Sequence, residues 1–222
     1  MSPARRPERW APRPRPVWRR PWVLGATGLL AVVAYVWWTA GERPLPSLDP
    51  TRDTVVFLGD SITGGHGLAL DVAFPHRLGA TLGLKVRNAG VSGDTTAGAL
   101  DRLRADVLAY QPKLVVVELG ANDALRRVPV ADTQRNLRTV VRQIRESGSG
   151  VILVHIRVPT LGGDVHRDGF RAIAREEGAR LVEDFLDGVV PGLTTDGLHP
   201  TAEGHTRLAA RLEPVLRELL AR

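Results

Sequence analysis

The stretch Thr54-Val55-Val56-Phe57-Leu58-Gly59-Asp60-Ser61 decides the fold, because an apolar run ends abruptly in a glycine, a carboxylate and a serine. Consecutive β-branched and aromatic residues bounded by glycine predict a buried strand. Ser61 then follows the carboxyl end of that strand, at the edge where open α/β sheets bind ligands. A serine there is also compatible with a simple turn or helix cap, so its meaning depends on the rest of the chain.

Strand and helix patterns alternate along the rest of the chain. Four more apolar runs predict strands at residues 84–88, 113–119, 151–156 and 180–182. Helical periodicity appears at residues 72–82, 96–109, 130–147, 166–178 and 201–220. This alternation predicts one α/β domain over residues 54–222, with a parallel five-stranded sheet covered by helices on both faces.

The net charge of +6 belongs to the amino-terminal segment, because residues 1–20 contain seven arginines and one glutamate. The other 23 basic and 23 acidic residues cancel, so the rest of the chain has no excess charge to attract nucleic acid. Prolines among the arginines predict an unfolded cytoplasmic tail over residues 1–20. The absence of cysteine excludes disulfides, thiolate metal sites and lipid attachment through cysteine.

Residues 21–41 are predicted to form a transmembrane signal anchor. The stretch from Trp22 to Ala40 contains no charged residue, and a helix of that length spans about 28 Å, close to the thickness of the bilayer core. Tryptophans stand near both ends, as in the aromatic belts of membrane helices. A cleaved signal peptide is the alternative, but Trp38 lies where cleavage requires a small residue.

The arginines predict the orientation of this segment. They precede it in large excess, so the positive-inside rule places the tail in the cytoplasm and the domain outside it. Three prolines in residues 42–53 predict a short stiff linker that lifts the domain off the membrane. The expected location is the cell membrane with a single span, or outside the cell if the segment is cleaved.

Polar clusters follow the other predicted strands in the same way as Ser61. Residues 88–95 follow the second predicted strand, residues 120–123 follow the third, and residues 196–199 come just before the last predicted helix. Because the carboxyl ends of parallel strands share one sheet edge, we expect these clusters to converge. His199 can take the proton of Ser61, and Asp196 can orient the imidazole. The amides of Ser61 and Gly93 and the side chain of Asn122 can donate to an oxyanion.

Each of these residues alone is more typical of a cap or a turn, and their joint occurrence is what indicates acyl transfer. The other histidines lack the spacing of metal ligands, and His155 inside an apolar strand is typical of a core histidine. We therefore predict no metal site.

The residues also carry a resemblance to a known family. Four ordered blocks resemble those of the SGNH (GDSL) hydrolase superfamily: Gly59-Asp60-Ser61-Ile62, the stretch 88–95 with Gly93, Gly120-Ala121-Asn122-Asp123 and Asp196-Gly197-Leu198-His199-Pro200. Within it, Val117-Glu118-Leu119-Gly120 and Ile156-Arg157-Val158-Pro159 are similar to the arylesterase, thioesterase and lysophospholipase group. Two departures are Ala121, where that group usually has glycine, and a short stretch at 161–164, where relatives often carry a longer loop.

The resemblance implies a flavodoxin-like three-layer α/β/α sandwich without a metal or organic cofactor. It implies that Ser61 is the nucleophile, that Gly93 and Asn122 belong to the oxyanion hole, and that Asp196 and His199 complete a triad. The expected function is hydrolysis of a small acyl ester or thioester, with the membrane contacted only through the anchor. Two alternatives stay open: a carbohydrate O-acetyl esterase, and a membrane-tethered binding module without turnover.

Overall fold

The computed structural model describes residues 43–158 and 163–221. The predicted tail at 1–20 and the predicted span at 21–41 lie outside these residues. Within the described part of the chain, no helix is both long enough and apolar enough to cross a bilayer. The compact unit that contains the sheet runs from Glu42 to Arg222.

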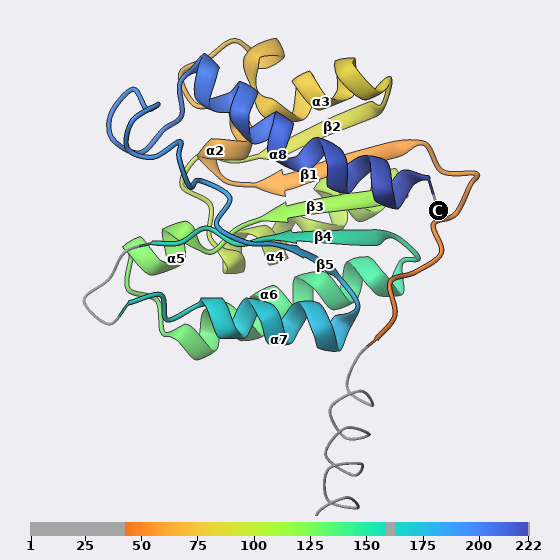
Figure 1. Ribbon diagram of the computed structural model, residues 1–222. Helices are drawn as coiled ribbons and strands as arrows, with labels where there is room; N and C mark the ends of the chain where they lie inside the picture. Colours follow the sequence, from red (N-terminus) through yellow and green to blue (C-terminus); the bar gives the residue numbers. More distant parts are fainter. Residues whose placement is uncertain (1–42, 159–162, 222) are drawn as a thin grey trace, which may run out of the picture. The chain divides into compact units, whose positions relative to one another are not determined.

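Five parallel strands form the sheet at the centre of this unit (Figure 1). They are β1 (Thr54–Gly59), β2 (Lys85–Gly90), β3 (Leu114–Glu118), β4 (Gly150–Val154) and β5 (Arg180–Val182). Their order across the sheet is β2-β1-β3-β4-β5, which is the order of flavodoxin-like doubly wound folds. The predicted fold of the domain, an α/β sandwich with a parallel five-stranded sheet, is confirmed.

Helices cover both faces of the sheet. The α-helices are α2 (Ser61–Gly64), α3 (Phe74–Leu82), α4 (Thr96–Asp106), α5 (Ala121–Leu125), α6 (Val130–Glu146), α7 (Arg167–Glu177) and α8 (Ala202–Leu220). Two 3₁₀ turns, η2 (Leu70–Val72) and η3 (Leu108–Tyr110), complete the described elements. Helices α3 and α8 pack on one face, whereas α4, α6 and α7 pack on the other (Figure 1).

The continuous apolar runs of the strands follow from this double coverage. Val56 and Leu58 of β1 belong to the core cluster under α4, α6 and α7. Val55 and Phe57, which point the opposite way, belong to the cluster under α3 and α8. Because successive side chains alternate between the faces and both faces are buried, the central residues of β1 are all apolar.

Some boundaries differ from the prediction. Strand β2 continues to Gly90, because its pairing with β1 extends to the register pair of Gly59 and Gly90. The short helices α2 and α5, which begin one or two residues after β1 and β3, were not predicted. Helices of four or five residues are too short to show a 3.6-residue period, so the sequence pattern cannot reveal them.

Residues 43–53, which belong to the predicted linker, pack against the domain. Arg43 donates its amide to the Arg175 carbonyl at 3.0 Å and places its guanidinium 3.3 Å from Glu177. Leu48 is buried, and Arg52 donates to the Pro112 carbonyl at 3.2 Å. Apolar side chains among the prolines provide this packing, so the compact unit starts before residue 54.

Candidate active site

Ser61 lies at the start of α2, directly beyond the carboxyl end of β1. The preceding Asp60 caps this short helix, because its Oδ1 accepts the amide of Ile62 at 2.9 Å. Gly59 permits the tight turn, since a Cβ at that position would lie 2.2 Å from Thr63 Oγ1. The strand, the glycine and the cap together place Ser61 at the edge of the sheet.

His199 lies between Ser61 and Asp196. Its Nε2 is 3.0 Å from Ser61 Oγ, and its Nδ1 is 2.6 Å from Asp196 Oδ2. The serine hydroxyl can donate to Nε2 when Nδ1 carries the proton and donates to the carboxylate. The structure therefore brings together the three predicted residues in the order that proton removal from a serine requires.

Asp196 also shapes its own loop. Its Oδ1 accepts the amide of Leu198 at 3.0 Å and the amide of His199 at 2.7 Å. The backbone hydrogen bond from His199, followed by that from its imidazole, holds the pKa of the Asp196 carboxyl well below its usual range. Asp196 is therefore ionised at neutral pH, and the same carboxylate turns the loop and orients the imidazole.

Three hydrogen-bond donors are candidates for binding an oxyanion. The Ser61 amide stands in the first turn of α2, where helix amides have no intrahelical acceptor. Gly93 has a φ of +76°, which favours glycine, and Arg126 fixes this loop by donating to the Gly93 carbonyl at 2.7 Å. Asn122 Nδ2 donates one hydrogen to Asp60 Oδ2 at 2.9 Å, which leaves its second hydrogen for a ligand.

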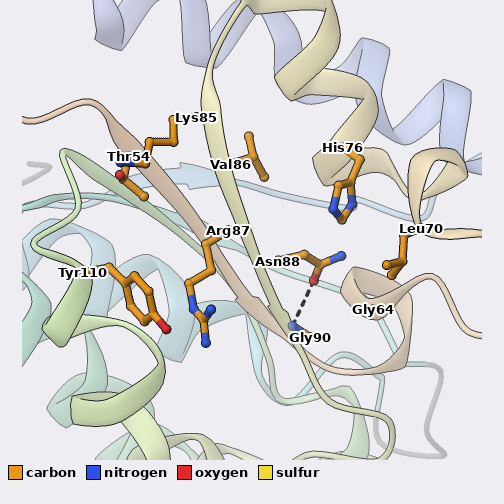
Figure 2. A pocket seen from close by; sticks show the side chains of 10 residues that line it. All are labelled: Thr54, Gly64, Leu70, His76, Lys85, Val86, Arg87, Asn88, Gly90 and Tyr110. Atoms are coloured by element: carbon orange, nitrogen blue, oxygen red, sulfur yellow. Dashed lines mark hydrogen bonds between the residues drawn. The ribbon is translucent and has the colours of Figure 1, made fainter.

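The carboxyl end of β2 supports the helix that carries Ser61 (Figure 2). Asn88 Nδ2 donates to the Thr63 carbonyl at 2.8 Å. Asn88 Oδ1 accepts the Gly90 amide at 2.9 Å, the bond drawn as a dashed line in Figure 2. Gly90 has no room for a side chain, because a Cβ there would lie 2.2 Å from Gly64 N. This close backbone approach lets α2 pack directly on β2.

The hollow drawn in Figure 2 has a volume of about 500 Å³ and is lined by neither Ser61 nor His199. Two of its charged side chains already have partners within the fold. Lys85 Nζ is 3.6 Å from Asp53 Oδ1, and Arg87 Nε donates to the Asp106 carbonyl at 3.0 Å. Both basic side chains of this hollow are therefore paired within the fold, and the hollow lies apart from the candidate catalytic residues.

A second pocket, of about 540 Å³, adjoins the site. Its lining includes Ile62, Ala121 and Leu198, each of which is next in the chain to one of the candidate site residues. The other apolar lining residues are Leu125, Ile156, Val158, Leu186, Val190 and Pro191. Arg157 and Asp187 supply its charged groups and bind each other at 2.9 Å. A pocket of this character fits an apolar group attached to the reacting atoms.

Among the described residues, His155, Asp164 and Asp184 offer ligand atoms within 4.8 Å of one another, as a metal ion would require. Arg167 already binds both carboxylates, donating to Asp164 at 3.1 Å and to Asp184 at 3.0 Å. The guanidinium thus supplies the positive charge that a metal would bring. The predicted core position of His155 is confirmed, because its side chain is fully buried and its Nε2 lies 3.3 Å from Asp164.

Comparison with known proteins identifies the family. Residues 57–207 match the model of the GDSL-like lipase/acylhydrolase family. The chain belongs to this family. Its relatives are esterases and thioesterases, and the chain is accordingly an ester-bond hydrolase.

Several relatives and solved structures are similar along most of their length. Esterase TesA of Pseudomonas aeruginosa is 37% identical over 179 residues, covering 75% of this chain and 89% of that protein. Thioesterase 1/protease 1/lysophospholipase L1 of Escherichia coli is 32% identical, with coverages of 76% and 85%. A crystal structure of TesA aligns with a TM-score of 0.67 over 75% of this chain and 99% of the other. Esterase EstA from Pseudoalteromonas aligns at 0.71 and 27% identity, over 77% and 100% of the two chains.

The sequence alone assigned no role to Glu118, which the structure places next to the candidate site. Glu118, at the end of β3, is fully buried beside Asp60. Burial raises the pKa of Asp60 to about 6, and burial next to Asp60 raises the pKa of Glu118 well above its usual value. The sequence feature that could have revealed this residue is a single carboxylate within the otherwise apolar run 114–119, because a buried carboxylate requires a partner or a proton.

Proposed function

We propose that the chain is a serine esterase in which Ser61 is the nucleophile, His199 the general base and Asp196 the residue that orients the base. The observation that carries this proposal is the continuous line from Ser61 Oγ through His199 to Asp196, with distances of 3.0 and 2.6 Å. A hydroxyl becomes a useful nucleophile when a base stands ready to take its proton, and this line supplies such a base.

In the proposed mechanism, Ser61 Oγ attacks the acyl carbonyl while its proton moves to His199 Nε2. The amides of Ser61 and Gly93 and the free hydrogen of Asn122 Nδ2 bind the resulting oxyanion. His199 then protonates the leaving alcohol or thiol, and an acyl group stays on Ser61. A water molecule, activated by the same histidine, releases the acid and restores the serine.

The proposed substrate is a carboxylic ester or thioester with an apolar acyl group. The aliphatic lining of the 540 Å³ pocket beside the site supports this choice, because such walls bind hydrocarbon and not the hydroxyl groups of a sugar. Relatives named arylesterase, from Vibrio mimicus, and thioesterase 1/protease 1/lysophospholipase L1 support the same class of substrate.

A second candidate function is the removal of O-acetyl groups from glycans. One relative, an acetylxylan esterase of Geobacillus stearothermophilus, is 26% identical over 201 residues and covers 71% of this chain. The apolar pocket argues for the first candidate. The complete set of nucleophile, base and donors argues against a third candidate, a membrane-tethered binding module without turnover.

We also propose that residues 21–41 anchor the enzyme in the cell membrane, with residues 1–20 in the cytoplasm and the hydrolase domain outside it. The uncharged stretch 22–40 and the arginines that precede it support this topology. Cleavage of the segment would instead release the domain as a secreted enzyme.

The function is tested with p-nitrophenyl esters of increasing chain length, from acetyl to palmitoyl, hydrolysed by the full chain and by Ser61→Ala. We expect a burst of p-nitrophenol with the wild type and none with Ser61→Ala, because only the serine can hold the acyl group. The apolar pocket predicts that kcat/KM is higher for longer acyl groups than for acetyl.

Ser92→Ala is the matched control, since Ser92 lies in the loop after β2 and its Oγ is 3.4 Å from His66 Nδ1. We expect this variant to keep the burst. A burst that persists in folded Ser61→Ala would overturn the nucleophile assignment. A preference for acetyl esters would instead favour the glycan deacetylase.

A further inference from the structure

Two carboxyl groups share the buried space beneath Ser61. Asp60 precedes the serine and is 2% exposed, while Glu118 ends the neighbouring strand β3 and is fully buried. The register of the sheet brings them together, because Gly59 of β1 pairs with Glu118 of β3. The proposed mechanism uses Ser61 and Asn122 but assigns no role to Glu118.

The hydrogen bonds around this pair leave one oxygen atom without a partner. Asp60 accepts from the Ile62 amide with one oxygen and from Asn122 Nδ2 with the other, both at 2.9 Å. Glu118 Oε2 accepts from Thr63 Oγ1 at 2.6 Å. Glu118 Oε1 is buried and has no hydrogen-bond partner within the described residues. A bare carboxylate oxygen in this position would be costly, because it has lost its hydration and gained no donor.

The charged groups near the pair do not compensate for two negative charges. Burial is the main cause that raises the pKa of Asp60, and the smaller effects of His199, which lowers it, and Asp94, which raises it, have opposite signs. Arg102 donates to the Gly59 carbonyl at 3.2 Å, but its charge is paired with Asp94 at 2.7 Å. Within residues 43–158 and 163–221, no lysine or arginine forms an ion pair with Asp60 or Glu118. Two adjacent buried carboxyl groups in this setting retain one proton between them.

The second carboxyl group holds that proton. Asp60 already accepts two hydrogen bonds, which stabilise its ionised form. Donors near Glu118, namely the Thr63 hydroxyl and the backbone amides of Asp60 and Thr63, lower its pKa less than its surroundings raise it. Its Oε1, which has no hydrogen-bond partner among the described residues, is the atom that can carry the proton. Burial also raises the pKa of Glu118 well above its usual value, with Asp60 as the next contribution.

We propose that Glu118 is a positioning residue of the oxyanion hole: its protonated carboxyl group donates from Oε1 to the Asp60 carboxylate, which holds the amide of Asn122 toward the acyl oxygen. This inference rests on the proposed roles of Ser61 and Asn122. The proton completes a line of hydrogen bonds from Thr63 through Glu118 and Asp60 to Asn122. Every acceptor in the line is then satisfied without a buried counterion.

Two variants of Glu118 separate this role from simple packing. In Glu118→Gln, the amide nitrogen can donate to Asp60 while the amide oxygen accepts from Thr63, so the line survives. In Glu118→Leu, the side chain has a similar size but cannot donate. We expect Glu118→Gln to keep most of kcat and Glu118→Leu to lose about tenfold or more with KM little changed, because an oxyanion donor acts mainly in the transition state.

The pH profile of kcat gives a readout that a packing role would not move. Without its donor, the Asp60 carboxylate is harder to keep ionised, so the acidic limb of kcat moves to higher pH in Glu118→Leu and stays in place in Glu118→Gln. Wild-type kcat in folded Glu118→Leu, or the same acidic limb in both variants, would overturn the proposal.

Infrared spectroscopy tests the proton directly and does not depend on catalysis. At neutral pH the wild type is expected to show the C=O stretch of a protonated buried carboxyl group, and Glu118→Gln is expected to lack it. Glu177 provides the matched control, since it is 3% exposed but lies 2.8 Å from Arg142. Glu177→Gln should leave the band and kcat unchanged.

Absence of the band from the wild type would also overturn the proposal. A burst retained by Ser61→Ala would instead overturn the proposed function while leaving the infrared band in place, so the two failures can be told apart.

Discussion

Asn122 binds Asp60 through one amide hydrogen and, in the proposed mechanism, the acyl oxygen through the other. Its neighbour Asp123 has a purely structural role, because it is buried and accepts the amide of Thr96 at 3.0 Å, which ties α5 to α4. Two adjacent polar residues therefore serve different purposes. Asp123 fixes the helix in the fold, and Asn122 projects from the same helix toward Asp60.

The first prediction concerns Asn122→Ala. Removal of one oxyanion donor typically costs a factor of about 10² to 10³ in kcat, and we expect a loss in that range with little change in KM. Steady-state kinetics on a p-nitrophenyl ester measures both constants. Asn136→Ala is the control, because Asn136 lies on α6 and donates only weakly to Thr96 at 3.4 Å. An unchanged kcat in Asn122→Ala would remove this residue from the oxyanion hole.

At the scale of secondary-structure elements, one histidine joins α8 to α3. His205 of α8 is buried, and its Nδ1 accepts the amide of Phe74, the first residue of α3, at 3.2 Å. The two rings are stacked with centroids 6.0 Å apart. Burial lowers the pKa of His205 to about 4, so the imidazole stays neutral and keeps its lone pair as an acceptor. This contact fixes one end of the two helices that cover the same face of the sheet.

The second prediction concerns how the contact between His205 and Phe74 affects the stability of the fold at acid pH. Because the folded state holds the pKa of His205 below its ordinary value of 6.5, the unfolded chain takes up the proton first as the pH falls. The stability that the neutral imidazole provides is complete above pH 6.5 and is lost as the pH falls toward 4. Allowing for partial solvent screening, we expect a loss of about 2 kcal/mol.

Urea unfolding of the wild type and of His205→Asn, followed over this pH range, measures the effect. The asparagine oxygen can still accept the Phe74 amide but does not titrate, so any change with pH in the difference between the two unfolding free energies comes from His205. Parallel pH dependence of the two proteins would contradict the assignment.

At the scale of the whole molecule, charge and hydrophobicity are unevenly divided along the chain. The charge excess of +6 lies within residues 1–20, whereas the remainder of the chain is balanced. The sheet domain contains the candidate catalytic residues, whereas the amino-terminal segment has the features of a membrane-targeting signal. The proposed topology therefore depends on residues 1–41 and the proposed chemistry on the domain.

The third prediction concerns this topology. Protease added to spheroplasts that express the full chain should digest the domain, because the positive-inside rule places it outside the cytoplasm. A variant that lacks residues 1–41 should instead remain in the cytoplasm, protected from the protease and soluble. Protection of the domain in the full chain would reverse the proposed orientation.

The alternation of strand and helix patterns was enough to predict the domain fold. Continuous apolar runs such as 114–117 are buried on both faces, and this requires helices on both sides of a parallel sheet. The meeting of Ser61, Asp196 and His199 followed from the same reasoning, since the loops after parallel strands share one edge. Patterns of period two and 3.6 report which face of an element is apolar, and that information is local to each segment.

The contacts that surround and support the candidate site were decided only by the tertiary structure. The packing of residues 43–53 on the domain and the burial of Glu118 against Asp60 depend on strand register and on which surfaces meet. The apolar pocket likewise gathers residues from separate segments of the chain. The sequence by itself determined the strands, the longer helices and which polar residues gather at the sheet edge, because these follow from local pattern and chain order. Only the tertiary structure decided what supports that chemistry, because strand register and side-chain packing are set by long-range contacts.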